Sequence, residues 1–459
     1  MKDRFGFDWG QVTGTHFWNR PSLGRRLFFR HFASAVGGYL LLPSRPMETV
    51  ARAAGTPMGT AANCIFILMS GAPSHVDTFD LKEGPWLPAA MAATSYGDLR
   101  WPQGLLPKLA SHLDSIALMR SIRGWSAVHG LGQTWLQIGR NPANLQAKTA
   151  PHIGSVVSLE LGGPRESRTL PAFLSLNTGT GPGQGYFPPD HSPFYVSPGG
   201  GGLGNTAHRD GQAVFARRYN LLTDLDGEAR ATGELGDAVS QMVSFNESAR
   251  KMMYNPAVDR VFIFDAAERA RYGNTAFGNA CITARNLLRA KLGTRFIQIT
   301  VGGWDNHAGI YTGALNPANA NSLGHQFDNA LGTLLTDLKN DGLFDETLVV
   351  ALGEFGRTVG PLNAQQGRDH YVQQSALLAG ARIGGGRAIG ATDNEGRFTT
   401  QPGWSRERDI RTEDLEATIY SALGIDWTKI LRDDPTGRGF EYVPFASQDL
   451  YGPVHELWG

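Results

Sequence analysis

Four short stretches of the chain gather residue types that can bind a metal ion and an anion. They are 74–80 (Ser-His-Val-Asp-Thr-Phe-Asp), 304–307 (Trp-Asp-Asn-His), 354–357 (Glu-Phe-Gly-Arg) and 367–370 (Gly-Arg-Asp-His). Carboxylate oxygen and imidazole nitrogen together suit zinc or manganese best, and calcium or magnesium when oxygen dominates. An arginine adds a planar fork that holds a tetrahedral oxyanion such as phosphate or sulfate. The four stretches therefore predict a metal-assisted ester-hydrolysis site.

Each stretch also has an ordinary structural interpretation. A single histidine such as His75 or His370 commonly serves as a hydrogen-bonded structural residue, and Asp77 can cap a helix. Glu354 and Arg357 can form a structural ion pair. A shared site is favoured because the stretches follow predicted strands.

Three apolar runs predict those strands, at 64–69, 295–301 and 347–352, each followed by glycine or by Ser-Gly. Apolar residues at helical spacing predict helices at 277–292 and 327–338, with Gly342 at the end of the second. This alternation predicts an α/β fold with a mostly parallel central sheet covered by helices on both faces. Ligands of such sheets bind beyond the carboxyl ends of the strands, where the four stretches fall.

Composition limits the classes of function. A chain of 459 residues with 41% apolar residues can bury a large core, and we expect one domain over 54–459. Lys plus Arg and Asp plus Glu are equal at 42 each, so no excess positive charge suggests a nucleic-acid partner. Residues 177–205 are rich in glycine and proline and predict a long surface loop, either a lid over the site or a linker.

The first 53 residues predict an export signal. Arg25 and Arg26 precede an apolar stretch at 32–42 that is too short for a membrane span, and 51–53 (Ala-Arg-Ala) fits a cleavage site. The pattern resembles a twin-arginine signal, which implies a periplasmic or extracellular protein exported already folded. An amphipathic first helix that happens to contain two arginines is the alternative. No later apolar run is long enough to span a bilayer, so we expect no membrane span in the mature protein.

The ordered motifs resemble the bacterial family called domain of unknown function 1501. They are Ser-Gly-Ala-Pro-Ser-His-Val-Asp-Thr-Phe-Asp at 70–80, Gly-Gly-Trp-Asp-Asn-His at 302–307, Gly-Glu-Phe-Gly-Arg-Thr at 353–358 and Gly-Arg-Asp-His at 367–370. The sequence Gly-Ala-Thr-Asp at 390–393 also fits. That family is similar in fold to the alkaline phosphatase and sulfatase superfamily, so the resemblance implies this fold and a divalent metal.

The resemblance also implies roles for individual residues. The implied metal set is His75, Asp77, Asp305, His307, Glu354, Asp369 and His370. Within it, Asp305 and His307 are the paired ligands, and Asp369 orients a ligand histidine. Glu354 departs from the superfamily, which usually has Asp at that place. Arg357 or Arg368 would hold the anionic group.

The position of the nucleophile departs further from the superfamily pattern. Sulfatases carry Cys or Ser in a Cys-x-Pro-Ser-Arg stretch whose helix ends in Thr-Gly-Arg, whereas here 138–140 is Ile-Gly-Arg. Counting back from that ending places His129 at the nucleophile position. Three interpretations remain. His129 is itself the nucleophile or a general base for metal-bound water, Ser126 is the nucleophile, or the protein has lost the nucleophile. His129 can also be a structural residue at a helix start.

Two functions are consistent with these residues. The first is a metal-dependent hydrolase that acts on a phosphate, sulfate or related ester, with an anionic ester or glycan as substrate. The second is a non-catalytic, sulfatase-like binding protein for an anionic glycan or a cell-surface partner, which the unusual His129 favours.

Overall fold

The computed structural model describes residues 56–179, 181–231 and 236–459. The chain divides into two units, Met1–Ala53 and Ala54–Gly459, and every described residue belongs to the second. The predicted twin-arginine signal lies outside the described residues. Among those that are described, no helix has both the length and the apolar composition to cross a bilayer.

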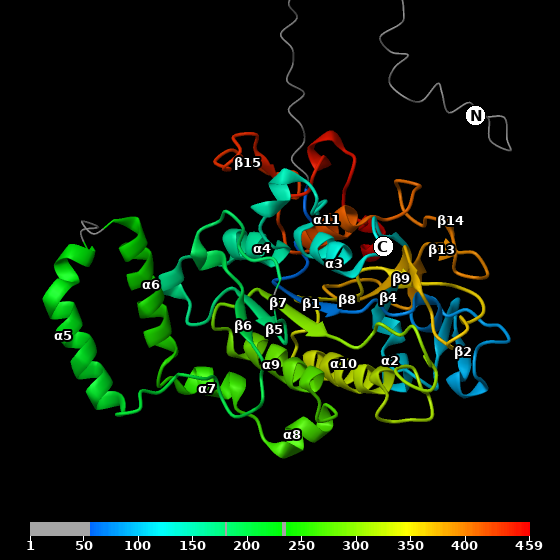
Figure 1. Ribbon diagram of the computed structural model, residues 1–459, viewed down its shortest axis with the longest axis horizontal. Helices are drawn as coiled ribbons and strands as arrows, with labels where there is room; N and C mark the ends of the chain where they lie inside the picture. The colour runs from blue at the N-terminus through cyan, green and yellow to red at the C-terminus, as the bar shows by residue number, and fades with distance from the viewer. Residues whose placement is uncertain (1–55, 180, 232–235) are drawn as a thin grey trace, which may run out of the picture. The chain divides into compact units, whose positions relative to one another are not determined.

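An eight-stranded sheet forms the centre of the fold, in the order β12-β4-β11-β8-β1-β7-β5-β6 (Figure 1). Its strands are β1 Asn63–Met69, β4 Ile116–Arg123, β5 Phe173–Leu176, β6 Phe194–Val196, β7 Phe296–Val301, β8 Thr347–Leu352, β11 Gln373–Gly380 and β12 Arg387–Ile389. β1 pairs in parallel with both β7 and β8. Only β11 runs antiparallel to its neighbours, β4 and β8. The predicted mostly parallel sheet is confirmed.

Helices cover both faces of this sheet (Figure 1). The α-helices of the described residues are α2 Pro107–Ala110, α3 His129–Ile138, α4 Ile153–Leu161, α5 Gln212–Ala231, α6 Asp237–Met252, α7 Pro256–Phe262, α8 Ala266–Arg271, α9 Ala276–Ala290, α10 Leu323–Asn340 and α11 Thr412–Ala422. Of these, α5 and α6 extend away from the sheet (Figure 1). α2, α7, α9 and α10 bury their apolar side chains in one core, and α3, α4 and α11 in the other. Alternate β1 residues enter the two cores, Ile65 and Ile67 one and Phe66 and Leu68 the other, which explains the continuous apolar run.

Short two-stranded pairs complete the fold. They are β2 Ala93–Tyr96 with β3 Leu99–Pro102, β9 Gly356–Arg357 with β10 His370–Tyr371, β13 Ala391–Thr392 with β14 Thr399–Gln401, and β15 Ile430–Leu431 with β16 Phe440–Glu441. Residues 177–205, expected as one long loop, also contain β6, which pairs in parallel with β5 at the sheet edge. Phe194 and Val196 are half-buried and pack against the core, so this stretch is anchored to the sheet despite its many glycines.

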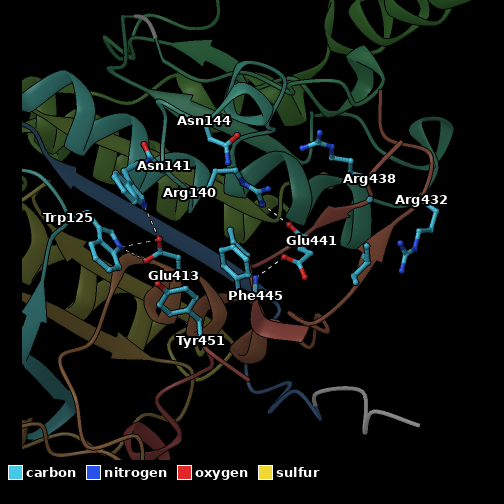
Figure 2. Close-up of a pocket in the computed structure, with 14 residues that line it drawn as sticks. Trp125, Arg140, Asn141, Asn144, Glu413, Arg432, Arg438, Glu441, Phe445 and Tyr451 are labelled. Carbon is cyan, nitrogen blue, oxygen red and sulfur yellow. Dashed lines mark hydrogen bonds between the residues drawn. The ribbon is translucent and has the colours of Figure 1, made fainter. Parts of the chain in front are cut away.

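A buried carboxyl group lies where α3 meets α11. α3 ends at Gly139 in the left-handed region (φ 61°), and a Cβ at this position would collide with the carboxyl group of Glu416. Glu416 Oε1 accepts a 2.9 Å hydrogen bond from the hydroxyl of Tyr420. Arg140 directs Nη2 to the carbonyl of Glu441, at 2.7 Å (Figure 2). Burial raises the pKa of Glu416 to about 8, although the charge of Arg140 and the Tyr420 hydroxyl act in the opposite direction.

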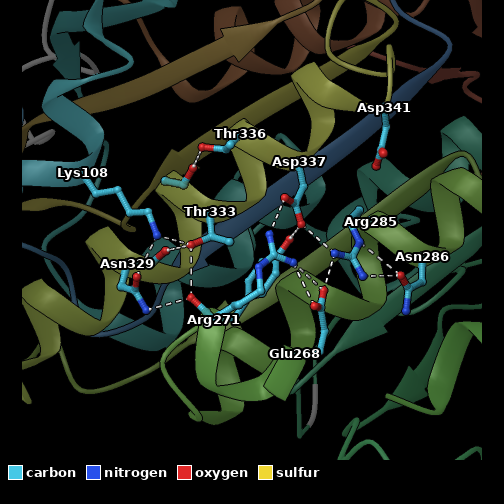
Figure 3. A network of polar contacts seen from close by, with 12 residues as sticks. Lys108, Glu268, Arg271, Arg285, Asn286, Asn329, Thr333, Thr336, Asp337 and Asp341 are labelled. Carbon is cyan, nitrogen blue, oxygen red and sulfur yellow. Dashed lines mark hydrogen bonds and ion pairs between the residues drawn. The ribbon is translucent and has the colours of Figure 1, made fainter. Parts of the chain in front are cut away.

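A polar network ties α8, α9 and α10 together on the other face (Figure 3). Asp337 of α10 is buried and accepts from Arg271 (2.7 Å), from the hydroxyl of Tyr272 (2.7 Å) and from Arg285 (2.6 Å). Burial opposes the charge on Asp337, but these donors outweigh it and lower the pKa of the carboxyl group. The network therefore depends on a charged Asp337.

We expect Asp337→Asn to lower the free energy of unfolding by about 2 to 3 kcal/mol, because buried Arg285 loses one carboxylate partner and keeps Glu268 as the other. The matched control is Asp341→Asn, at the same end of α10, which breaks a more exposed ion pair with Arg289 of α9. It should lower the free energy of unfolding by less than about 1 kcal/mol. Chemical unfolding of the three proteins measures both values. Equal losses in the two variants would contradict the role given to Asp337.

The buried Glu416 predicts a pH dependence of stability. Its folded carboxyl group keeps its proton up to about pH 8, whereas the unfolded chain releases it near 4.5. The folded state therefore binds more protons between these values, and this contribution to stability falls as pH rises. Glu416→Gln cannot titrate, so its Tm relative to the parent should rise from pH 5 to pH 8. Glu407→Gln, at an exposed position, should show no such trend.

Candidate metal centre

The loops that follow β1, β7 and β8 meet at one edge of the sheet, because parallel strands end on the same side. The N–H of Gly71, after β1, donates to Glu354 Oε1, after β8, at 3.0 Å. Gly71 has φ 103°, and a Cβ there would lie 2.5 Å from the backbone nitrogen of Asp305, after β7. Only glycine lets the β1 and β7 loops approach this closely.

Three imidazole rings surround one carboxylate oxygen at this edge. The Nε2 atoms of His307, His129 and His370 lie 3.0, 3.3 and 3.6 Å from Asp305 Oδ1. Nε2 of His307 is also 3.0 Å from Nε2 of His370. Ligand atoms of His129, Asp305 and His370 all lie within 4.8 Å of one another. The spacing is short enough for one cation to contact several of these atoms.

The second nitrogen of each ring contacts an oxygen acceptor. Nδ1 of His129 is 2.6 Å from Glu354 Oε1, Nδ1 of His307 is 2.8 Å from Asp369 Oδ1, and Nδ1 of His370 is 2.8 Å from the carbonyl oxygen of Ala127. A carboxylate or carbonyl oxygen has no hydrogen to donate, so each Nδ1 carries the proton. In the neutral ring the Nε2 lone pair then faces the centre, as in metal-binding histidines whose other nitrogen is held by an acceptor.

Arg357 lies beside this cluster with its side chain almost fully buried. Nη2 donates to Asp305 Oδ1 at 2.6 Å, Nη1 lies 3.3 Å from Nε2 of His307, and Nε donates to the carbonyl of Ala72. Burial disfavours the charge on Asp305, but Arg357 and the neighbouring imidazoles outweigh it and lower the pKa of the carboxyl group. The centre thus combines a carboxylate with a buried, fixed cation.

Two buried polar atoms at the centre indicate that the donor set fits a metal. Among the described residues, Nε2 of His129 and Oε2 of Glu354 have no hydrogen-bond partner. Such atoms are costly when buried, and two Nε2 lone pairs facing one another need a shared proton or a cation. Three imidazoles and one carboxylate form a nitrogen-rich set, which suits zinc or manganese better than calcium or magnesium.

Helix α3 contributes a residue that sequence reasoning missed. Gln133 lies one turn after His129, and its amide donates to Glu354 Oε1 and to the hydroxyl of Ser70, both at 2.9 Å. Its spacing of four residues from His129 on a predicted helix is the signal that could have found it. The carbonyl of Ala127 had no such signal, because any residue can supply a backbone oxygen.

Three of the expected site residues form their own buried contacts. Asp77 is fully buried and accepts from Nε of Arg368 at 2.7 Å and from the hydroxyl of Tyr311 at 2.5 Å. Arg368 is fully buried by this pair and by backbone carbonyls. Nε2 of His75 lies 2.9 Å from the carbonyl oxygen of Gly396, and burial lowers its pKa. We expected these three side chains at the metal centre, but they make separate contacts of their own. The buried carboxylate of Asp77 needs a cationic partner, and Arg368 supplies it.

The remaining expected residue, Ser126, precedes α3. Its hydroxyl accepts from the N–H of Val128 at 3.1 Å, which is a local turn contact of the kind that serine commonly makes. The structure therefore brings together His129, Asp305, His307, Glu354, Arg357, Asp369 and His370.

Several solved structures are similar to this chain at low identity. The crystal structure of Ps i-CgsB matches with 12% identity and TM-score 0.39, over 87% of this chain and 78% of that one. The PsFucS1 sulfatase from Pseudoalteromonas sp. matches with 11% identity and TM-score 0.39, over 80% and 68%. A protein in the alkaline phosphatase superfamily from Vibrio parahaemolyticus matches with 12% identity and TM-score 0.34, over 81% and 69%. Similarity this low transfers no activity or substrate to the present chain.

No curated protein matches the sequence. The family model of the proteins of unknown function called DUF1501 matches residues 61–448, which is most of the chain. This confirms the resemblance that the four ordered motifs predicted. The chain belongs to the DUF1501 family.

Proposed function

We propose that the protein is a metal-dependent hydrolase of phosphate, sulfate or related esters. The observation that carries the proposal is the approach of three Nε2 atoms to Asp305 Oδ1 while each Nδ1 is held by an acceptor. In this proposal the metal ligands are Asp305, His129, His307 and His370. Glu354 orients His129 through Oε1 and offers its unpartnered Oε2 as a further ligand, Asp369 orients His307, and Asp77 serves the fold through Arg368.

The chain's own residues then have distinct roles. A divalent metal bound there would polarise the ester oxygen and make water a better nucleophile. Arg357, whose N–H groups donate to backbone carbonyls and to Asp305, would stabilise negative charge at the centre through its fixed positive charge. His129 occupies a ligand position, so the attacking group is water and not a side chain of the enzyme.

A specific observation also keeps the second function open. The first residue of α3 is an imidazole where sulfatases carry the nucleophile, and the hydroxyl of Ser126 is engaged in a local turn. A protein that retains the centre to bind an anionic glycan or a cell-surface partner without turnover would have the same features. In both proposals the twin-arginine pattern supports a periplasmic or extracellular location.

We expect the purified parent, exported in folded form, to hold about one divalent metal ion per chain, and Asp305→Ala/His307→Ala to hold none. Elemental analysis measures both. The control is Asp345→Ala/His455→Ala, which removes the same two residue types at exposed positions and should keep the metal. A parent that takes up no zinc, manganese or calcium would refute the metal centre.

Turnover of an aryl phosphate and an aryl sulfate, before and after chelation, separates the two functions. Turnover that is lost with the metal and restored by adding it supports the hydrolase. A metal-loaded parent that turns over neither ester while binding an anionic glycan supports the binding protein.

Asp369→Ala tests the orienting role of that carboxylate. Because the bond from His307 Nδ1 is lost while the ligands remain, we expect metal affinity to fall about ten- to hundredfold. Asp369→Asn keeps an oxygen acceptor and should lose less. Competition with a chelator of known affinity measures the effect, and Asp345→Ala is the exposed control. Unchanged affinity in Asp369→Ala would show that the bond has no influence on the metal.

A further inference from the structure

Residues of α3, α11 and the segment 430–451 line a cavity of about 530 Å³. Figure 2 shows Trp125 at one end of it and Arg432 and Arg438 at the other. The volume lies within the range of about 300–1,000 Å³ that small-molecule sites occupy. None of its lining residues belongs to the proposed metal centre.

One wall of the cavity is aromatic and held rigidly. The rings of Trp125 and Trp135 stack with centroids 5.8 Å apart. Glu413 is buried and accepts from both indole N–H groups, at 2.9 Å from Trp125 and 3.0 Å from Trp135. The guanidinium of Arg411 lies 4.3 Å from the centroid of the Trp125 ring. A ligand that packs here need not order these rings, which lowers the entropic cost of binding.

Phe445, a residue that is 50% exposed, adds another aromatic ring to the cavity. Its backbone has φ 56°, a conformation that is strained for a bulky residue. The N–H of Phe445 donates to Glu441 Oε2 at 2.7 Å, which holds the strained turn in place. The fold thus maintains an exposed ring at this cavity against a conformational cost.

Two arginines lie at the other end of the cavity. Arg432 and Arg438 are exposed, and within the described part of the chain no carboxylate forms an ion pair with either. Asp434 lies between them in sequence, but its carboxylate accepts from the backbone N–H groups of Thr436 (2.9 Å) and Gly439 (2.6 Å). Both guanidinium groups are therefore available to an anion.

We propose that this cavity binds an acidic saccharide chain, with one sugar ring against the aromatic wall and sulfate, phosphate or carboxylate groups of other units on Arg432 and Arg438. Guanidinium forks match such oxyanions, and aromatic rings pack on the apolar face of a sugar. Asn141 also lines the cavity. Its Oδ1 accepts from the N–H of Ala143 at 2.9 Å, and its amide NH2 group can donate to a hydroxyl group of the sugar.

This inference rests on the proposed function, because it assigns the cavity as a substrate subsite of the proposed metal centre. Trp135 follows His129 by six residues on α3, which places it about 9 Å further along the helix. Six residues also rotate Trp135 to a different face of α3 from His129, so a saccharide of several units is needed to reach from the cavity to the centre.

Calorimetric titration of the full chain with a sulfated dextran oligosaccharide, at constant ionic strength, tests the proposal. We expect Arg432→Gln/Arg438→Gln to weaken binding by about tenfold or more, because charge-assisted hydrogen bonds are lost. Arg217→Gln/Arg260→Gln removes two exposed arginines from α5 and α7 and should retain the affinity. Phe445→Ala should weaken binding about fivefold through loss of the aromatic face, and the unsulfated oligosaccharide should bind much more weakly than the sulfated one.

Equal losses in the two arginine double variants, or full affinity in Phe445→Ala, would reduce the effect to general charge attraction and overturn the proposal. The titration is repeated on chelator-treated protein, which separates this inference from the metal centre. Binding that persists there supports the cavity even if the hydrolase is refuted. If binding is lost when the metal is removed, the saccharide binds at the metal centre. That result would refute the cavity as the saccharide site and leave the proposed hydrolase function unaffected.

Discussion

The buried carboxylate of Glu354 joins the segments on which the rest of the site depends. It follows β8, and its Oε1 accepts from the N–H of Gly71 after β1 and from Gln133 on α3, with Nδ1 of His129 at 2.6 Å. A carboxylate removed from water is stable only when donors surround it. This need for donors around Glu354 fixes the first turn of α3 against the ends of two strands. It thereby also fixes the position of the His129 ring.

The parallel sheet brings the other ligands to the same place. β7 pairs with β1, so the loop after it carries Asp305 and His307 to the edge that Glu354 occupies. The β9–β10 pair places Arg357 and His370 in register with one another. Segments hundreds of residues apart therefore meet without any one of them containing a complete site, and each ring is oriented by an acceptor from a different segment.

Much of the fold was predictable from local patterns. The apolar runs at 64–69, 295–301 and 347–352 correspond to β1, β7 and β8, because strands buried on both faces need no polar alternation. The apolar stripes correspond to α9 and α10. The short edge strand β6 was not predicted, since its three residues carry too little pattern to distinguish them from a glycine-rich loop.

By itself, the sequence determined the class of fold, the family, and the kinds of residue that follow the strands, because these depend on apolar periodicity and ordered motifs. Only the tertiary structure decided which of those residues act together. Asp77 and Asp305 look equivalent in sequence, and each pairs with an arginine, Arg368 and Arg357, yet three imidazoles surround only Asp305. Which acid has imidazoles beside it, and which ring nitrogen faces the centre, depends on donors and acceptors that distant segments supply only once the chain has folded.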